Sequence, residues 1–399
     1  MDAARPDPSG RVRSLRRDAE QRRRLVVGNI VANLVLLALS PARETGSALA
    51  VATAKTRPTR YDRGDFPQRM LKEVVAALAS AGMLTVEPYV YKQRTTTVEP
   101  TTEFLELLVS YGIRLADVGR EAGGETIWLV ARTGGPRFYN QPLPKCLVHY
   151  EDTEETTRLR HEVATITDML GGAGVTYDGE AVGPLFLHRS FLVRSPEAPA
   201  EFNLNGRLWG GFWQTLDSEK RHRITIGGEG ITDLDFAAMH PTMAYLQVTG
   251  RPPSGDPYDI PGLEEHRSGA KQAMASLLSR TGPMLSLAPK LKAKLPEGWT
   301  ARQLVEAISG RHPAIAHLFG TDLGGSLMHM ESRILMAVLL ELARRGIAAL
   351  PMHDGIQTKL SDAEEAMEVM QSVSEQMLGV ALPVKEKPIW RPSSLANAA

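Results

Sequence analysis

Two aspartates stand in apolar settings that are typical of carboxylates held at the end of a strand. Asp235 lies in ITDLDFAAMHP and Asp354 in LPMHDGIQTK. Between them along the chain, Arg267 and Lys271 are four residues apart in RSGAK. Separated carboxylates can bridge paired Mg²⁺ ions, and cations can receive the triphosphate of an incoming nucleotide. These residues therefore predict a site for two-metal phosphoryl transfer.

The strand predicted for residues 231–236 presents two carboxylates on one face. In ITDLDF, the two-residue repeat of a strand puts Asp233 and Asp235 on one side and apolar residues on the other. Asp233 then lies about 7 Å along the strand from Asp235, near the limit for sharing a metal pair, so it is a reserve ligand. The following AAMHPTMAYLQ predicts a helix. An exposed strand end without a metal is the alternative.

The cations of RSGAK predict a phosphate-binding helix face. Arg267 and Lys271 are separated by four residues, which puts both side chains on one face of a helix. Glu264, in the preceding turn, is a candidate partner for Arg267. Lys271 has no acidic residue within one turn on either side, which leaves its ammonium group for a phosphate. A solvated helix face is the alternative.

Two further polar groups stand in predicted turns. His353 and Asp354 occupy a tight hairpin between an apolar and a polar strand, where an aspartate can also simply bond its own backbone. Arg207 follows a glycine in NGRLWGG, and such a turn can bring a guanidinium group to a phosphate of a nucleic-acid backbone. Arg207 is therefore a candidate primer or template contact, with a solvated arginine as the alternative.

Composition excludes some classes of protein. The 399 residues are enough for two or three domains, and 43% hydrophobic with 23% charged residues is ordinary for a soluble globular protein. The 46 basic and 46 acidic residues balance, so a nucleic-acid surface has to come from local clustering. Cys146 is the only cysteine, which excludes an intrachain disulfide and a cysteine-rich zinc site and indicates a cytoplasmic protein.

The N-terminal residues predict a basic, flexible tail over residues 1–24. Eight arginines and three acidic residues lie between Arg5 and Arg24, which is typical of a solvated terminus or of a tether to a DNA backbone. The apolar run from Leu25 to Ala42 is interrupted by asparagines and is shorter than the roughly 20 residues that a membrane span needs. We therefore expect no membrane role.

Residues 25–112 predict a winged-helix-like domain that binds duplex DNA. Apolar residues at helical spacing from Met70 onward predict a helix that ends at Gly82. The β-branched stretch that follows predicts a hairpin with the basic tip Lys92-Gln93-Arg94, and a further helix is predicted over residues 101–110. A small α+β packing domain is the alternative.

The remaining chain also mixes strands and helices, so the predicted fold class is α+β. Residues 113–202 are interpreted as a connecting, thumb-like region, with a buried strand in ETIWLVART and a helix in EETTRLRHEVATITDML. In residues 203–399, SLMHMESRILMAVLLELARRG carries the apolar stripe of a long helix that ends at Gly346. A hairpin is predicted in AALPMHDGIQTKL.

The order of these motifs resembles family A DNA polymerases, the bacterial polymerase I type. In that family a Gly-Arg-Leu turn precedes motif A, whose aspartate opens a D-Y-S-like sequence; here GRL is followed by DFA at Asp235. Motif B carries Arg-x3-Lys, matched by Arg267 and Lys271, and motif C carries V-H-D-E, matched by MHDG ending at Gly355. The helix before motif C is also similar. The resemblance covers residues 203–390.

The resemblance implies a compact nucleotidyltransferase with a polymerase palm, an antiparallel sheet with helices, and reduced helical fingers over residues 203–399. Asp235 and Asp354 would hold two Mg²⁺ ions, with Mn²⁺ as a substitute. Arg267 and Lys271 would clamp the nucleoside triphosphate.

The remaining site residues follow from the same resemblance. His240 stands where motif A usually carries a glutamate that helps to exclude the ribose 2′-hydroxyl, and it would contact the sugar. His353 and Arg207 would position the primer end or the template. The implied partners are a DNA primer-template and nucleoside triphosphates.

The sequence departs from the family pattern in several places. Gly355 stands where motif C has its second carboxylate, which single-subunit phage RNA polymerases also lack. With His240 in place of a glutamate, the choice between deoxyribonucleotides and ribonucleotides stays open. Motif B follows motif A by only 32 residues, so compact fingers are expected. The aromatic and the Tyr-Gly ending of motif B are replaced by Ala275, Ser279 and Arg280.

The predicted function is primer extension by a DNA polymerase in the DNA replication of a plasmid, phage or mobile element. No proofreading exonuclease is expected, because the region before residue 203 is too short for such a domain beside a winged helix. An RNA polymerase or primase on the same palm is one alternative. A replication initiator that binds duplex DNA and carries a degenerate palm is another.

Overall fold

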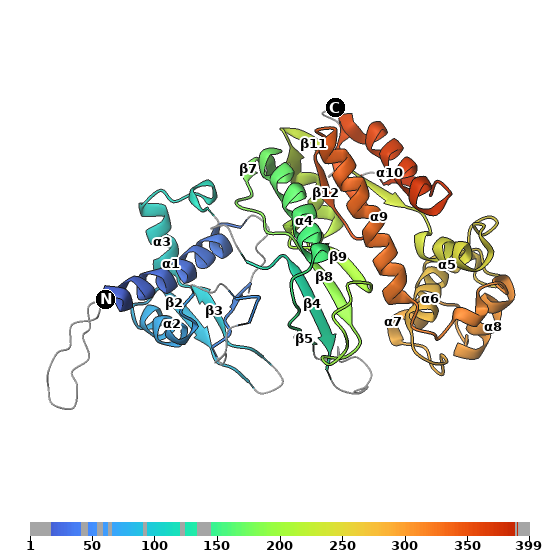
Figure 1. Ribbon diagram of the computed structural model, residues 1–399, viewed down its shortest axis with the longest axis horizontal. Coiled ribbons are helices and arrows are strands. Elements are labelled where there is room, and N and C mark those ends of the chain that lie inside the picture. The colour runs from blue at the N-terminus through green and yellow to red at the C-terminus, as the bar shows by residue number, and fades with distance from the viewer. Residues whose placement is uncertain are drawn as a thin grey trace. The chain divides into compact units, whose positions relative to one another are not determined.

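The computed structural model shows an α+β protein (Figure 1). The residues it describes are 17–40, 47–53, 59–62, 66–90, 94–119, 124–133, 145–387 and 389. They form helices together with antiparallel and mixed sheets, which confirms the predicted fold class in this coarse form.

The chain divides into two compact units, and this division differs from the predicted boundaries near residues 112 and 202. Strand β4 (Ile127–Arg132) pairs with β8 (His188–Val193), and helix α4 (Glu154–Gly172) packs against α9 (Gly324–Arg344). The packing of α4 on α9, and the pairing of β8 with β9 (Asn205–Trp209), join the predicted connecting region to the residues that follow it. The first unit is Met1–Glu125 with Thr176–Pro184, and the second is Thr126–Val175 with Leu185–Ala399.

The first unit combines helices with a small antiparallel sheet of strand order β1-β3-β2. A short pair, β6 (Val175–Tyr177) with β7 (Glu180–Ala181), is formed later in the chain. The elements before it are α1 (Arg17–Leu39), β1 (Leu49–Ala50), η1 (Gln68–Met70), α2 (Leu71–Ser80), β2 (Leu84–Glu87), β3 (Thr97–Pro100), α3 (Thr102–Ser110) and η2 (Leu115–Asp117).

Both helices predicted around the hairpin are confirmed. In α2, Val74 and Leu78 are buried at helical spacing, and Gly82 follows the helix with a φ of +72°, in the left-handed region that favours glycine. Helix α3 begins at a cap in which the Thr101 hydroxyl accepts a hydrogen bond from the N–H of Phe104. The apolar spacing of α2 was therefore sufficient to place that helix.

The predicted hairpin is confirmed as the antiparallel pair β2 and β3. Its basic tip was predicted at Lys92-Gln93-Arg94, and the first two of these residues lie outside the described residues. Arg94 forms an ion pair with Glu87 at 2.8 Å. The charge of this arginine is therefore shared with a carboxylate on the same hairpin.

The apolar run near the N-terminus packs into the core of the first unit. Val26, Ile30 and Leu34, four residues apart, are buried on one side of α1. Among the described residues, no helix has the length and apolar character that crossing a membrane requires. Since α1 begins at Arg17, the predicted flexible tail is wrong for residues 17–24; residues 1–16 lie outside the described part. Helix propagation from the apolar run and an ion pair between Arg24 and Glu20 explain this difference.

The second unit contains one mixed and one antiparallel sheet. The mixed sheet has the order β5-β4-β8-β9, in which only β4 and β8 are parallel. In the antiparallel sheet, β11 lies between β13 on one side and β10 and β14 on the other, and β12 pairs with β13. Besides β4 and β8, the strands of these two sheets are β5 (Lys145–Leu147), β9 (Asn205–Trp209), β10 (Ile224–Ile226), β11 (Glu229–Phe236), β12 (Ala349–Pro351), β13 (Gly355–Lys359) and β14 (Val384–Lys387).

Helix α9 is the central helix of this unit. It packs against α4, α10 and β9, and helices α5 to α8 gather near its N-terminal end (Figure 1). Its predicted apolar stripe and its end before Gly346 are confirmed. The other helices are α5 (Met239–Thr249), α6 (Arg267–Ser279), α7 (Pro289–Lys292), α8 (Ala301–Arg311), α10 (Ala363–Leu378), η3 (Phe212–Gln214), η4 (Ser218–Arg223), η5 (Glu264–His266), η6 (Ala316–Leu318) and η7 (Leu360–Asp362).

A buried arginine ties β8 to the helices around it. Arg189 is 2% exposed, and burial lowers its pKa to about 10 although Glu162 favours the charged form. The guanidinium group contacts the Glu162 carboxylate at 3.1 Å and donates a hydrogen bond to the carbonyl oxygen of Gly206 at 2.9 Å. Arg189 therefore links α4 to the turn that precedes Arg207.

We predict that His329 on α9 makes the folded state sensitive to acid. Burial, with help from the charge of Arg189, lowers the pKa of His329 to about 4. The unfolded chain takes up the proton first, so this histidine lowers stability as the pH falls from about 6.5 to about 4, by on the order of 3 kcal/mol. His329→Asn should flatten the pH dependence of the urea midpoint between pH 7 and pH 4. An unchanged pH profile would contradict this assignment.

Candidate active site

The antiparallel sheet brings Asp235 beside the turn that contains Asp354, between β12 and β13. Asp235 on β11 stands opposite Gly355 on β13, and the N–H of Phe236 donates a hydrogen bond to the carbonyl oxygen of Asp354 at 3.0 Å. As predicted for the strand, Asp233 and Asp235 share one face while Leu234 is fully buried on the other. Residues far apart in sequence therefore meet at one end of β11.

The absence of a side chain at position 355 has a steric cause. A Cβ atom added to Gly355 would lie 2.2 Å from the carbonyl oxygen of Leu234 and 2.3 Å from Oδ1 of Asp235. The carboxylate of Asp235 therefore occupies the space that the Cβ atom of any other residue at position 355 would need. The second carboxylate of motif C is incompatible with this position of Asp235.

We predict that restoring the carboxylate of the family pattern is harmful. Gly355→Glu should lower the free energy of unfolding by about 2–4 kcal/mol, since its Cβ overlaps backbone atoms that have little room to move. It should also lower any catalytic activity, because Asp235 has to move. Urea denaturation, with Gly228→Ala in an open turn as the control, measures the first effect. A variant of wild-type stability with higher activity would contradict the steric reading.

The three aspartates of the site differ in their partners. The ammonium group of Lys387 on β14 contacts Oδ2 of Asp235. Oδ2 of Asp233 accepts a hydrogen bond from Arg221 at 3.2 Å, and its Oδ1 is buried without a hydrogen bond. The carboxylate of Asp354 has no hydrogen-bond or ion-pair partner among the described residues and faces a cavity.

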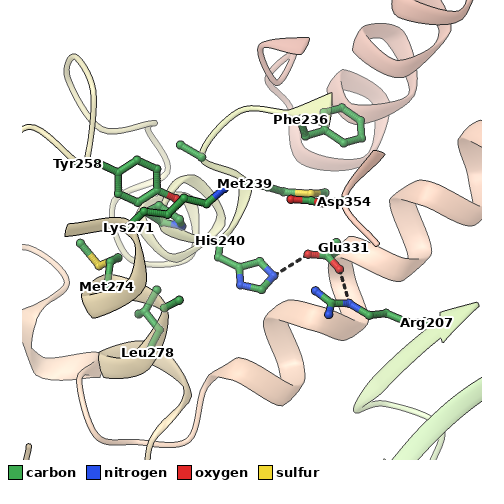
Figure 2. A pocket seen from close by; sticks show the side chains of 13 residues that line it. Arg207, Phe236, Met239, His240, Tyr258, Lys271, Met274, Leu278, Glu331 and Asp354 are labelled. Carbon is green, nitrogen blue, oxygen red and sulfur yellow. Dashed lines mark hydrogen bonds and ion pairs between the residues drawn. The ribbon is translucent and has the colours of Figure 1, made fainter. Parts of the chain in front are cut away.

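This cavity has a volume of about 110 Å³ and is lined by both polar and apolar side chains. Figure 2 shows Lys271 and Tyr258 on one side, with Asp354 across from them and an ion-paired group below. Asp235, Arg267 and His353, all predicted for the site, are not among its lining residues. Its polar lining residues are Arg207, His240, Tyr258, Lys271, Glu331 and Asp354.

The two cations of RSGAK are both on α6 but have different surroundings. The Lys271 side chain is exposed, lines the cavity, and has no polar partner in the described part of the chain. Arg267 instead forms two hydrogen bonds to the Asp256 carboxylate, at 2.6 and 3.2 Å. The predicted partner of Arg267 was Glu264, whose side chain accepts a hydrogen bond from the N–H of Gly262. Folding of the preceding loop brings Asp256 closer.

Tyr258 forms an aromatic wall of the cavity. Burial raises its pKa to about 12, and the Arg267 guanidinium group lies 5.0 Å from its ring centroid. Its loop is anchored from behind, because His312 Nε2 contacts the carbonyl oxygen of Pro257 at 2.8 Å and Nδ1 contacts the Tyr245 hydroxyl at 2.9 Å. Tyr258 thus gives the cavity an aromatic side chain, whereas the positions that correspond to the end of motif B carry Ala275, Ser279 and Arg280.

Arg207, His240 and Glu331 form one charged group at the cavity. Nε of Arg207 donates a hydrogen bond to Oε1 of Glu331 at 2.6 Å, and Nε2 of His240 lies 2.8 Å from Oε2 of the same carboxylate, at an angle outside hydrogen-bond geometry. Burial alone would raise the pKa of Glu331, but its contacts with His240 and Arg207 outweigh burial and lower it. The carboxylate is therefore charged at neutral pH.

The turn before Arg207 brings β9 against α9. Gly206 has a φ of +87°, and an added Cβ atom would lie 2.7 Å from the Ser332 hydroxyl and 2.9 Å from the Phe191 ring. The Ser332 hydroxyl also donates a hydrogen bond to the carbonyl oxygen of Asn205 at 3.1 Å. This close approach is what allows Arg207 to reach Glu331.

We predict that Gly206→Ala separates these two elements. The left-handed backbone and the overlap with Ser332 together should lower the free energy of unfolding by about 2–4 kcal/mol. Gly228→Ala is the matched control, because its φ of +83° is similar and no atom lies near its added Cβ, so only about 1–2 kcal/mol of backbone strain is expected. Equal urea midpoints for the two variants would show that the α9 contact is not tight.

His353 lies beside the cavity and not in its lining. Its ring packs against Trp209 of β9, with centroids 4.6 Å apart. Burial lowers the pKa of His353, and the charge of Arg207 lowers it further. Trp213 anchors the same segment by donating a hydrogen bond to the carbonyl oxygen of Pro351 at 2.9 Å. Of the two residues predicted to meet the primer or template, His353 thus packs on the strand that carries Arg207.

Several residues of the site were missed from the sequence. Glu331 had a signal, because it stands four residues from both Leu327 and Leu335 within the buried stripe of α9. An acid at such a position needs a partner. Asp256, Tyr258 and Lys387 had no comparable local signal, since their loop and edge-strand positions carry no periodicity.

The aspartates fit a divalent cation that substrate oxygens help to hold. No group of three or more His, Cys, Asp or Glu side chains is placed to hold a metal within the described ranges. Mg²⁺ in triphosphate sites is usually held by one or two carboxylates, with phosphates and water as further ligands. Asp354 faces the cavity without a polar partner in the described part of the chain, and Asp235 already contacts a positive charge, the Lys387 ammonium. This donor set is suited to Mg²⁺.

Comparison with known proteins finds only weak likeness, and that among solved structures. No family model matches the chain. No curated protein matches it either. Among solved structures, the POL domain of Pol1 from M. smegmatis, in complex with DNA primer-template and dNTP, matches with a TM-score of 0.33 and 11% identity over 92% of this chain. The chain spans 65% of the length of that protein chain. At this level the likeness decides neither family nor activity.

Proposed function

We propose that the chain is a template-directed nucleotidyltransferase, a DNA polymerase that extends a primer. One observation supports this most. Asp235, at the end of β11, lies beside the turn of Asp354, and Asp354 lines a cavity together with Lys271, which has no polar partner among the described residues. The two aspartates come from motifs that resemble motifs A and C. This combination supplies carboxylates for a metal and a cation for a phosphate. If the two aspartates only stabilised turns, a lysine without a polar partner among the described residues would not be expected beside them.

Each residue has a role in this proposal. Asp235 and Asp354 would hold Mg²⁺, or Mn²⁺ in its place, with Asp233 behind them and tied to Arg221. The bound metal would supply charge neutralisation at the phosphates and activation of the primer 3′-hydroxyl. Lys271 would bind the triphosphate of the incoming nucleotide. Lys387 would hold the Asp235 carboxylate in place.

The other wall residues would bind the rest of the substrate. His240 would contact the sugar, and Tyr258, held by Arg267, would form the wall opposite it. Arg207, with His353 next to it, would meet the primer end or the template. Arg267 is thereby reassigned from the triphosphate to the support of Tyr258, because both of its hydrogen bonds go to Asp256.

An RNA polymerase or primase is the second candidate, and His240 is the observation that favours it. In the family pattern a glutamate at this position helps to exclude the ribose 2′-hydroxyl, whereas here a histidine that contacts Glu331 takes its place. Ribonucleotides and deoxyribonucleotides should therefore be compared on the same primed template and on an unprimed one. Synthesis without a primer would favour the primase.

The first unit is proposed to bind duplex DNA as a winged helix. Its helices α1 and α2, followed by the β2–β3 hairpin in a sheet of order β1-β3-β2, support this. The exposed face of α2 carries Lys72 and Glu73 and is balanced in charge, so phosphate contacts would come from Arg22 and Arg23 of α1. A cytoplasmic role in replication of a mobile element fits both units. Duplex binding without a salt dependence would count against phosphate contacts.

A primer-extension assay tests the proposed function. Wild-type protein with Mg²⁺, a primed DNA template and deoxyribonucleoside triphosphates should add nucleotides complementary to the template. Omission of the metal or of the template should stop the reaction. If the protein binds DNA but adds no nucleotide under any of these conditions, the replication-initiator alternative replaces the polymerase.

A further inference from the structure

Glu331 joins two groups of the site that come from different elements. Arg207 lies on β9, His240 near the start of α5, and Glu331 on α9 between them. Figure 2 shows the carboxylate with one oxygen toward each partner. Glu331 is 2% exposed, so water cannot replace either partner easily. The two side chains are therefore held through a single buried anion.

A buried carboxylate constrains the groups that neutralise it. Loss of one partner leaves the buried carboxylate with a single polar partner, and this is costly unless the remaining partner moves closer. Arg207 is fixed on its other side by the Gly206 turn against Ser332. His240 has no other polar contact among the described residues. A displacement of Arg207 should therefore be answered by a movement of His240.

We propose that Glu331 is a positioning residue that couples the primer-side Arg207 to the nucleotide-side His240. This rests on the proposed polymerase function, in which Arg207 meets the primer end and His240 the sugar. A correctly placed primer end keeps Arg207 on Glu331 and thereby keeps His240 in position for the nucleotide. A misplaced primer end draws Arg207 away, and nucleotide binding weakens before any chemistry takes place.

The coupling predicts non-additive substitutions. With Glu331 present, Arg207→Ala and His240→Ala should each raise the nucleotide KM about tenfold. The double variant should raise it by little more than either single variant, because loss of Arg207 already misplaces His240. In a Glu331→Ala background the two substitutions should act independently, so that the fold-increases in KM multiply. Glu331→Gln, which keeps two polar contacts, should restore part of the non-additivity.

Steady-state primer extension with matched and mismatched primer ends measures these effects. Glu341→Gln is the control, because Glu341 lies on the same helix and binds two arginines, Arg344 and Arg345, near the surface. It should leave KM and kcat unchanged. In wild-type protein a mismatched primer end should raise the nucleotide KM, and this sensitivity should be lost in Glu331→Ala.

The outcomes separate this inference from the proposed function. Wild-type extension with additive effects of Arg207→Ala and His240→Ala would overturn the coupling and leave the polymerase intact. A wild-type protein that adds no nucleotide would overturn both. If Glu331→Ala does not fold, the cycle in the wild-type background still decides, because additivity there is incompatible with a shared anion.

Discussion

Replacement of Asp354 by asparagine is expected to lower the rate of nucleotide incorporation by about 10³-fold or more. Asparagine keeps the shape of the side chain and removes the charge that would hold Mg²⁺ at the cavity. Asp235→Asn should have an effect of similar size, since Gly355 opposite it has no carboxylate that could bind the metal in its place. Stability should change little, because the Asp354 carboxylate has no polar partner among the described residues.

The control for these variants is a carboxylate beyond the other end of β13 from Asp354. Asp362 follows β13 and forms an ion pair with Lys359 at 3.2 Å, away from the cavity. Asp362→Asn should retain wild-type incorporation in a primer-extension assay, and calorimetric Mg²⁺ binding with a nucleotide present should be lost only in the Asp235 and Asp354 variants. Wild-type rates for Asp354→Asn would remove the basis for metal-dependent catalysis here.

The elements that carry the site were predictable because their patterns are local. The alternation around Asp235 gave β11, the spacing in RSGAK gave α6, and the long apolar stripe gave α9. Each of these segments buries one face, so the spacing of its apolar residues, or in RSGAK of its two cations, indicates helix or strand. The hairpin of β12 and β13 followed from the same reasoning.

The partners of the charged residues were not predictable in the same way. Arg267 binds Asp256, although Glu264 is much closer in sequence, because the loop before α6 folds back onto that helix. Arg207 binds Glu331 on a distant helix. Which of several acids an arginine meets depends on tertiary packing, and sequence distance does not encode it. Only the polar interruption of the α9 stripe at Glu331 gave a local signal of such a contact.

The start of α1 illustrates the opposite error. The arginine-rich residues before Leu25 predicted a flexible tail on composition alone, yet the helix begins at Arg17. Repulsion between neighbouring arginines is partly relieved by the Glu20 carboxylate, which pairs with Arg24 one turn away. Extension of an existing helix costs much less than nucleation of a new one. The prediction from composition therefore missed that the helix of the buried apolar run extends toward the N-terminus as far as Arg17.

Lys271→Met is expected to raise the nucleotide KM about 10- to 100-fold, with little change in stability. The ammonium group is exposed and has no polar partner in the described residues, so its removal costs the fold nothing, whereas a charge-assisted contact to a phosphate contributes about 1.5–3 kcal/mol. Deoxyribonucleoside diphosphates and triphosphates should be compared as competitors. The variant should discriminate between them less than the wild-type protein does, because Lys271 is proposed to bind the phosphates.

Arg267→Met is the matched variant, since it removes a cation from the same helix face one turn away. Its guanidinium group binds Asp256 and lies over Tyr258, so we expect a loss of about 1 kcal/mol in stability and a smaller rise in KM, caused by movement of the tyrosine wall. Urea denaturation and nucleotide titration of both variants measure the two effects together. If Arg267→Met instead raises KM as much as Lys271→Met and leaves stability unchanged, then both cations bind the triphosphate, as the spacing in RSGAK alone predicts.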